Sequence, residues 1–198
     1  ERYSRAMVAG GPQSWNIRDI HMTDTLDRLL TWYGPEAKAV VWAHNTHVGD
    51  ARATDMAKAG MHNIGQLARQ RYGADAVVLV GFGSYQGSVI AAPRWGAAPE
   101  VLPMPAARED SIERRMHHEL PEQALLIFDG QPDWMAETVD HRAIGVVYDP
   151  ALEAWGNYVP TRMSERYDAF IWCDQTEALR PLAAQPVAGE LETYPAGT

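Results

Sequence analysis

Two histidines, separated by two residues, follow an apolar stretch in the first quarter of the chain. The stretch Lys38–Ala43 leads directly into His44, Asn45 and, two residues later, His47. Histidine is the usual proton-transfer group near neutral pH, and a His-x-x-His pair can bind a metal when a third ligand lies nearby. If Lys38–Ala43 forms a buried strand, the polar side chains lie at its carboxyl end, where open α/β sheets bind ligands. A plainer alternative is that one histidine caps the strand end by hydrogen bonding.

The two imidazoles can face one cleft only if the chain turns at Asn45, a residue type that tolerates turn geometry. Upstream, Arg18 and Asp19 stand at the start of an amphipathic helix expected over Asp19–Tyr33. Arg18 could bind a carboxylate or stabilise an oxyanion, whereas Asp19 could cap the helix by accepting its free backbone N–H groups. We therefore expect both imidazoles to face one concave pocket, with Arg18 close by.

Two other motifs carry less weight. Gly81-Phe82-Gly83, with Gly87 beyond it, lacks the G-x-G-x-x-G spacing of a dinucleotide loop and favours a tight turn. Adjacent residues of a helix point about 100 degrees apart, so His117-His118-Glu119 indicates a solvated helix face rather than a metal site. The sequence thus predicts no cofactor and no tightly bound metal.

Composition excludes two broad classes of function. The chain has 198 residues, a formal net charge of −9 and 46% hydrophobic residues, which fit a globular core. It has no basic stripe of the kind that binds nucleic acid, and no apolar run near the ~18 residues that a membrane helix needs. We therefore expect neither nucleic acid nor a membrane as a partner. The single Cys173 rules out an internal disulfide and favours a reducing compartment, hence a cytoplasmic location.

Helical periodicity alternates with short apolar runs along the chain. The predicted elements are helices over Asp19–Tyr33, Asn63–Tyr72 and, from a capping box of Asp110 with Glu113, through Leu120, and strands over Lys38–Ala43, Ala76–Gly81, Ala124–Phe128, Ala143–Tyr148 and Asp168–Cys173. Ser84–Ala91 indicates a short hairpin or edge strand around Gly87, and Pro93–Ala107 a surface loop. This alternation predicts an α/β fold with a mostly parallel sheet flanked by helices. We expect residues 1–16 to be irregular, 17–181 to form the core and 182–198 to form a tail.

Several of these motifs occur together in one known family. The chain resembles the erythromycin esterase family, which also includes proteins labelled succinoglycan biosynthesis proteins. The motifs that carry the resemblance are Arg18-Asp19-x-x-Met22, Trp42-Ala43-His44-Asn45-Thr46-His47, Gly65-x-Leu67, Tyr72-Gly73, Gly81-Phe82 with Gly87, Asp110-Ser111-Ile112-Glu113, Tyr167-Asp168-Ala169 and Glu192-Thr193-Tyr194-Pro195. They extend over nearly the whole chain.

The chain departs from the family pattern in two respects. Thr25 stands where the family usually has Asn. The family's N-terminal half, with a Gly-Glu-x-x-His motif whose histidine is the proposed general base for water attack on a macrolide lactone, is absent. The chain lacks an initiator Met and begins at Glu1, so we expect it to be the C-terminal portion of a larger α/β protein. That missing segment would be its partner.

The resemblance implies a cytoplasmic bacterial hydrolase that acts on an ester or macrolactone by general-base activation of water. By resemblance, His44 and His47 would line the cleft opposite the missing base, and Arg18 would help to bind the ester. Substrate-binding roles are expected for Asn45, Trp42 and Asp19. Two alternatives stay open: a non-catalytic binding or scaffold domain that kept the cleft, and a metal-dependent hydrolase that uses the two histidines as ligands.

Overall fold

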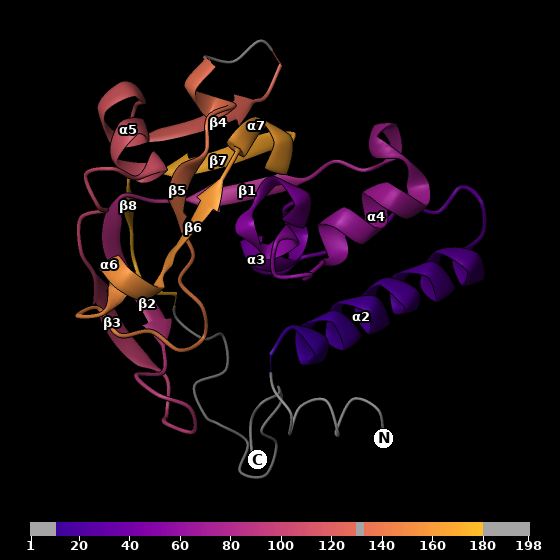
Figure 1. The fold of residues 1–198 in the computed structure, drawn as a ribbon, viewed down its shortest axis with the longest axis horizontal. Coiled ribbons are helices and arrows are strands. Elements are labelled where there is room, and N and C mark those ends of the chain that lie inside the picture. Colours follow the sequence, from indigo (N-terminus) through magenta and orange to yellow (C-terminus); the bar gives the residue numbers. More distant parts are fainter. Residues whose placement is uncertain (1–10, 130–132, 180–198) are drawn as a thin grey trace.

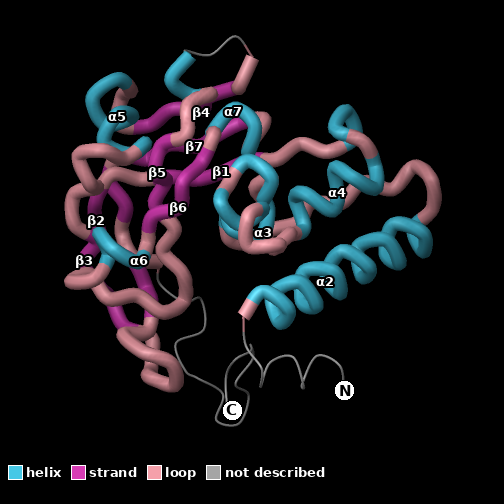
Figure 2. Tube along the Cα trace, viewed as in Figure 1, coloured by secondary structure: helices cyan, strands magenta, loops and turns pink. Residues whose placement is uncertain are grey.

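The computed structural model describes residues 11–129 and 133–179 (Figures 1 and 2). Its helices and strands, in chain order, are α2 (Pro12–Tyr33), α3 (Asn45–Val48), α4 (Ile64–Tyr72), β1 (Val80–Gly83), β2 (Gln86–Ala91), β3 (Glu100–Met104), α5 (Ile112–Glu119), β4 (Gln123–Ile127), β5 (Val139–Arg142), α6 (Glu153–Gly156), β6 (Tyr158–Thr161), α7 (Met163–Arg166), β7 (Ala169–Cys173) and β8 (Gln175–Thr176). Figure 1 shows α2 and α4 side by side on one side of the molecule, the strands on the other, and α3 between them. The fold is mixed α/β, as the sequence predicts.

The strands form three small sheets whose pairing is mixed. In the first sheet, with the order β1-β7-β4, β1 runs parallel to β7 and β4 runs antiparallel to it. The second has the order β3-β2-β8, antiparallel on one side and parallel on the other, and β5 pairs antiparallel with β6. The expectation of a mostly parallel sheet is therefore wrong. Parallel neighbours need long crossover connections, and the chain instead joins many of its strands by short loops and single helical turns.

The apolar core lies around β7. Phe170 and Trp172 are fully buried on this strand, and Ile112 and Met116 of α5 belong to the same cluster. The backbone of Gly81 packs directly against this core, because a Cβ atom there would come within 2.6 Å of the Phe170 ring. The tight turn expected at these glycines is therefore wrong: Gly81 and Gly83 are part of β1, where the absence of a side chain leaves room for the Phe170 ring, and Gly87 is part of β2.

Helix α2, on the helical side of the molecule, buries no apolar residue fully. It starts at Pro12, a favoured first helical residue, so the expectation that residues 12–16 are irregular is wrong. The only fully buried residues of α2 are the polar Asp19 and Thr23. The helix expected over residues 63–72 is confirmed as α4, with Asn63 as its N-cap and Gly73, at φ 87°, after its last turn.

Two predicted strands are absent. Lys38–Ala43 is neither helix nor strand, and Ala143–Tyr148 contributes only an isolated bridge between Val147 and Ala92. Both are apolar runs, but a strand needs a neighbour to pair with, and composition alone does not provide one. The strand expected over residues 76–81 begins later, as β1, whereas those at 124–128 and 168–173 are confirmed within one residue as β4 and β7.

Three smaller expectations also need correction. The segment 84–91 contains β2, which is the central strand of its sheet rather than an edge or a hairpin. The expected surface loop over residues 93–107 contains β3. The N-cap of α5 is Ser111 and not Asp110, whose carboxylate binds Arg108 instead. The expected tail at residues 182–198 lies outside the described residues, and no helix of the described ranges is long and apolar enough to cross a membrane.

Candidate functional site

His44 forms the N-cap of α3, and both of its ring nitrogens have partners. Nδ1 accepts the backbone N–H of Thr46 at 3.2 Å, and Nε2 lies 2.7 Å from the carbonyl oxygen of Ile144, to which it donates. Desolvation lowers the pKa of His44 below 6.5, against the hydrogen bond to Ile144, which raises it. His44 is therefore a neutral Nε2–H imidazole that caps the start of α3. The plainer alternative of a strand-end cap is right about the hydrogen bonding but wrong about the strand, because residues 38–43 form none.

His47 lies one helical turn further on and has one nitrogen engaged. Its Nδ1 is 2.8 Å from Oδ1 and 3.1 Å from Oδ2 of Asp19, whose side chain is fully buried. An ionised carboxylate only accepts hydrogen bonds, so Nδ1 of His47 carries the proton. No described residue pairs with Nε2, and 12% of the side chain stays exposed. His47 thus combines a buried carboxylate partner with an uncommitted ring nitrogen.

The start of α2 holds the ring of His47 in place. The Trp15 ring stacks on it at 4.4 Å between centroids, with the planes only 5° apart. Trp15 is itself fixed, because its indole N–H donates to the carbonyl of His62 at 2.9 Å. The neighbouring Asn16 accepts the backbone N–H of His62 at 3.0 Å. The imidazole is therefore held by Trp15 and Asp19 of α2, and Trp15 is in turn fixed by the loop that precedes α4.

Asn45 and Trp42 connect the turn to β1. The Asn45 side chain donates to the carbonyl of Phe82 at 2.6 Å and accepts its backbone N–H at 3.1 Å, so it pairs with the strand edge as a neighbouring strand would. Trp42 is 84% exposed, and its ring lies 5.5 Å from the Phe82 ring between centroids. The turn expected at Asn45 is present, since α3 begins there.

A large apolar groove opens beside this turn. Its cavity volume is about 1490 Å³, which exceeds the ~300–1,000 Å³ of an ordinary small-molecule pocket. Its walls come from α2 (Leu26, Leu30), from residues 34–45, from α4 and from residues 76–84. Valines of two of these walls are open to solvent, since Val40 is 92% and Val78 73% exposed. The groove is therefore an apolar surface that nothing in the described chain covers.

Not all predicted site residues meet in this groove. Of the six, the groove is lined by His44, Asn45 and Trp42. His47 and Asp19 face each other at the contact between α2 and α3. Arg18 is half-buried, and among the described residues no hydrogen bond or ion pair joins it to either histidine. The expectation that both imidazoles face one pocket is therefore wrong, because His44 lines the groove and His47 does not.

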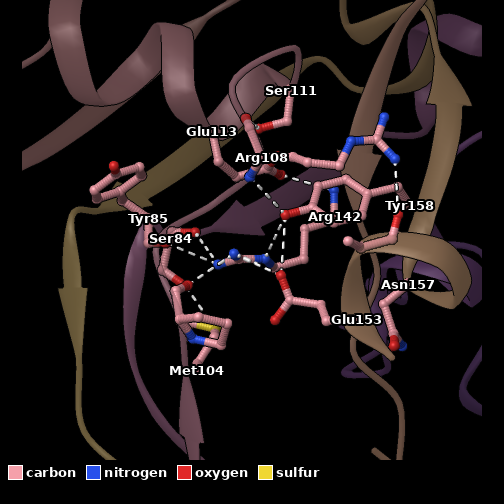
Figure 3. Close-up of polar contacts among 12 residues, drawn as sticks. Ser84, Tyr85, Met104, Arg108, Ser111, Glu113, Arg142, Glu153, Asn157 and Tyr158 are labelled. Atoms are coloured by element: carbon pink, nitrogen blue, oxygen red, sulfur yellow. Dashed lines mark hydrogen bonds and ion pairs between the residues drawn. The ribbon is translucent and has the colours of Figure 1, made fainter. Parts of the chain in front are cut away.

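The far end of the groove carries polar residues that the sequence analysis does not single out as site candidates. Arg142 of β5 lines the groove and binds Glu153 at 2.8 Å, with both side chains only 4% exposed. Its guanidinium also donates to the Tyr85 carbonyl at 2.8 Å and to the Tyr158 hydroxyl at 3.2 Å (Figure 3). A guanidinium so fully engaged holds strands together and has no donor to spare for a ligand.

Beside Arg142, Glu113 and His141 form a second buried pair. Nδ1 of His141 donates to Oε1 of Glu113 at 2.6 Å, and both side chains are 1% exposed. Burial by itself raises the pKa of Glu113, but the charge of His141, its hydrogen bond and the Arg142 backbone N–H outweigh it, so the pKa lies below 4.5. The sequence gives no indication that Glu113 pairs with His141, because the two residues lie 28 positions apart. The capping-box pattern instead assigns Glu113 to the start of a helix.

A third carboxylate–histidine pair joins α5 to the residue that follows β7. His117, expected on a solvated helix face, is one-third exposed and binds Asp174 through Nδ1 at 2.6 Å. Its ring stacks on Tyr85 at 3.8 Å. The described residues contain no group of three or more His, Cys, Asp or Glu side chains arranged to hold a metal ion. Each histidine pair is therefore a two-membered arrangement of a ring and a carboxylate.

Comparison with known proteins places this geometry in context. A family model described as erythromycin esterase matches residues 1–176. The fold is similar to the crystal structure of a succinoglycan biosynthesis protein (TM-score 0.68, 17% identity, 85% of this chain and 40% of that one) and to a protein from Bacillus cereus (TM-score 0.69, 16% identity, 84% and 40%). It is also similar to a mutant of the erythromycin esterase EreC in its open conformation (TM-score 0.60, 19% identity, 88% and 41%).

This chain thus spans about 40% of the length of the solved structures that it matches. The family match extends across the Arg-Asp motif of α2, the two histidines of the turn and the strands that carry the core. The chain belongs to the erythromycin esterase family.

Proposed function

We propose that this chain forms part of a hydrolase of the erythromycin esterase type, which cleaves an ester or macrolactone with water. The observation that carries the proposal is the state of His47. Its Nδ1 is held by a buried carboxylate and its Nε2 has no partner among the described residues, which is the arrangement of an imidazole that accepts a proton and passes it on. His44 differs, since both of its nitrogens are engaged within the chain.

In the proposed reaction, a water oxygen attacks the carbonyl carbon of the ester and the water loses a proton. The bond to the leaving oxygen then breaks, and that oxygen takes up a proton. His47 moves one of these protons at Nε2, and the carboxylate of Asp19 stabilises the imidazolium that forms. Arg18 is proposed to bind the ester or its developing oxyanion.

The groove supports a site that is completed by a further segment. Its volume exceeds that of an ordinary ligand pocket, and its walls include solvent-exposed valines and tryptophan. The solved structures that resemble this chain are about twice as long. We propose that a segment equivalent to the rest of those proteins covers the groove and supplies the principal base. The 198-residue chain alone is then expected not to hydrolyse esters.

The test compares this chain with the longest natural protein that contains it, on a panel of simple esters and macrolactones. In whichever protein turns over, His47→Gln should reduce kcat about 10²–10⁴-fold, the usual contribution of a general acid–base group. The matched control is His117→Gln, which removes a stacked, carboxylate-paired histidine on α5 and should leave kcat unchanged. Equal rates for His47→Gln and the unaltered protein would refute the proposal.

One alternative has an observation in its favour. A binding domain without chemistry would need only the groove, and the groove is mainly apolar. That alternative predicts macrolactone binding by the longest protein without any turnover. No observation favours the metal-dependent alternative, because His44 has no free nitrogen to coordinate an ion.

A further inference from the structure

Asp19 holds His47 through geometry that a substrate-binding carboxylate does not need. Asp19 is fully buried, so a bound substrate has no access to it in this structure. Oδ1 accepts from His47 and also from the backbone N–H of Ile64, at 3.3 Å. Oδ2 accepts from His47. Among the described residues, the hydrogen bonds of this carboxylate therefore all join α2 to a residue of α3 or α4.

The position of Ile64 explains why a charged carboxylate is stable here. Ile64 is the first residue of α4, a nine-residue helix. The first N–H groups of a helix lack intrahelical partners, and the helix dipole favours a negative charge beside them. Asn63, the residue before Ile64, also joins α4 to the α3 turn, since its side chain donates to the carbonyls of Thr46 and Gly49 at 2.7 and 2.5 Å. The cost of burying the Asp19 carboxylate is thus offset by the N-terminus of α4 and by the hydrogen bond from His47.

The contact leaves His47 with a single tautomer. Because Asp19 accepts at Nδ1, the proton of the neutral ring stays on Nδ1 and the lone pair stays on Nε2. Rotation of the ring by half a turn would bring carbon in place of Nδ1 against the carboxylate. The stacked Trp15 ring, itself held by the His62 carbonyl, keeps the imidazole plane fixed.

We infer that Asp19 is a positioning residue that fixes the Nδ1–H tautomer of His47 and so presents the Nε2 lone pair for proton transfer. The inference deepens the proposed function and rests on it for the use of that lone pair. The tautomer itself is a property of this chain and can be measured without any substrate. A measurement of the tautomer can therefore refute the positioning role of Asp19 whether or not the protein hydrolyses an ester.

The experiment is a long-range ¹H–¹⁵N correlation spectrum of the 198-residue chain with ¹⁵N-labelled histidine, at about pH 8, where ordinary histidines are neutral. The expected spectrum of the unaltered chain shows His47 mainly as Nδ1–H. In Asp19→Asn, the carbonyl oxygen can replace only one carboxylate oxygen and the NH₂ group is a donor, so the Nδ1–H form should become the minor one.

The matched control is Asp24→Asn, on the same helix, which removes an exposed partner of Arg71 and should leave the His47 tautomer unchanged. An Nε2–H ring in the unaltered chain overturns the inference without any variant, so poor folding of Asp19→Asn would not leave it undecided. An unchanged tautomer in a folded Asp19→Asn chain would overturn it as well. A shift in Asp19→Asn but not in Asp24→Asn supports it.

Discussion

The strand side and the helical side of this molecule are stabilised differently. On the strand side, β7 buries Phe170 and Trp172 completely between its neighbours. On the helical side, α2 buries only two polar residues and is held mainly by hydrogen bonds, such as those of Asp19 and Trp15. Leu26 and Leu30 line the open groove, and Trp32 is 84% exposed. The strand side has a closed apolar core, whereas the helical side has an apolar groove that no described residue covers.

The difference shows where the candidate site obtains its precision. Apolar burial is non-directional and roughly proportional to the area removed from water. A hydrogen bond to a buried carboxylate sets the orientation of one ring and the position of one proton. His47 lies on the helical side, where such directional contacts dominate, whereas the strand side provides the rigid support at Phe82 to which Asn45 is attached.

Hydrogen exchange should show the largest contrast between the two sides. No described hydrogen bond engages the backbone N–H groups of residues 38–43, whereas β7 is paired on both edges. Amides of β7 should exchange at least ~10³-fold more slowly, the factor for roughly 4 kcal/mol of opening free energy. Exchange mass spectrometry on the 198-residue chain measures this ratio. Similar protection of the two segments would mean that residues 38–43 are paired in solution.

Truncation of one tryptophan on each side should separate the two kinds of stabilisation. Trp172→Ala removes a fully buried ring and should lower the free energy of unfolding by about 3–5 kcal/mol. Trp32→Ala removes a ring that is 84% exposed and should change it by less than about 0.5 kcal/mol. Urea unfolding followed by circular dichroism gives both values. A large effect of Trp32→Ala would indicate that the open surface of α2 is covered, for example by a second copy of the chain.

Acid should destabilise the two sides in different pH windows. The pKa of His44 is lowered from 6.5, so its contribution to stability is complete above about pH 6.5 and is lost as the pH falls through its lower folded value. The pKa of Glu113 is lowered from 4.5, so its contribution is complete above about pH 4.5 and is lost below that. Urea midpoints over a pH series should therefore flatten near and below pH 6.5 in His44→Gln and below pH 4.5 in Glu113→Gln. Identical pH profiles for both variants would contradict these assignments.

The sequence predicts the strand side in part because two of its strands, β4 and β7, are mainly apolar runs. The segment Ala124–Phe128 is recognisable from composition, and so is Asp168–Cys173. Composition fails for Lys38–Ala43, an equally apolar run, because pairing depends on a neighbour that the local sequence does not encode. It fails in the opposite direction for β5, where His141 and Arg142 look exposed but are buried by ion pairs with Glu113 and Glu153.

The candidate site was predictable only in its residue types. The motif around His44 and His47 identifies both histidines, and the turn expected at Asn45 is present, although the two imidazoles do not share the groove. The pairing of His47 with Asp19 joins residues 28 positions apart on different helices, and no periodicity predicts it. The same is true of Trp15, because it lies in a segment expected to be irregular that forms the first turn of α2.

The most direct test of this account is the tautomer of each of the two motif histidines in the unaltered chain. The hydrogen bonds predict opposite states, with the proton of His44 on Nε2, facing Ile144, and that of His47 on Nδ1, facing Asp19. Long-range ¹H–¹⁵N spectra should therefore show one ring of each type. If both rings carry the proton on Nε2, His47 has no lone pair free for proton transfer, and its assignment as the proton-transfer group is wrong.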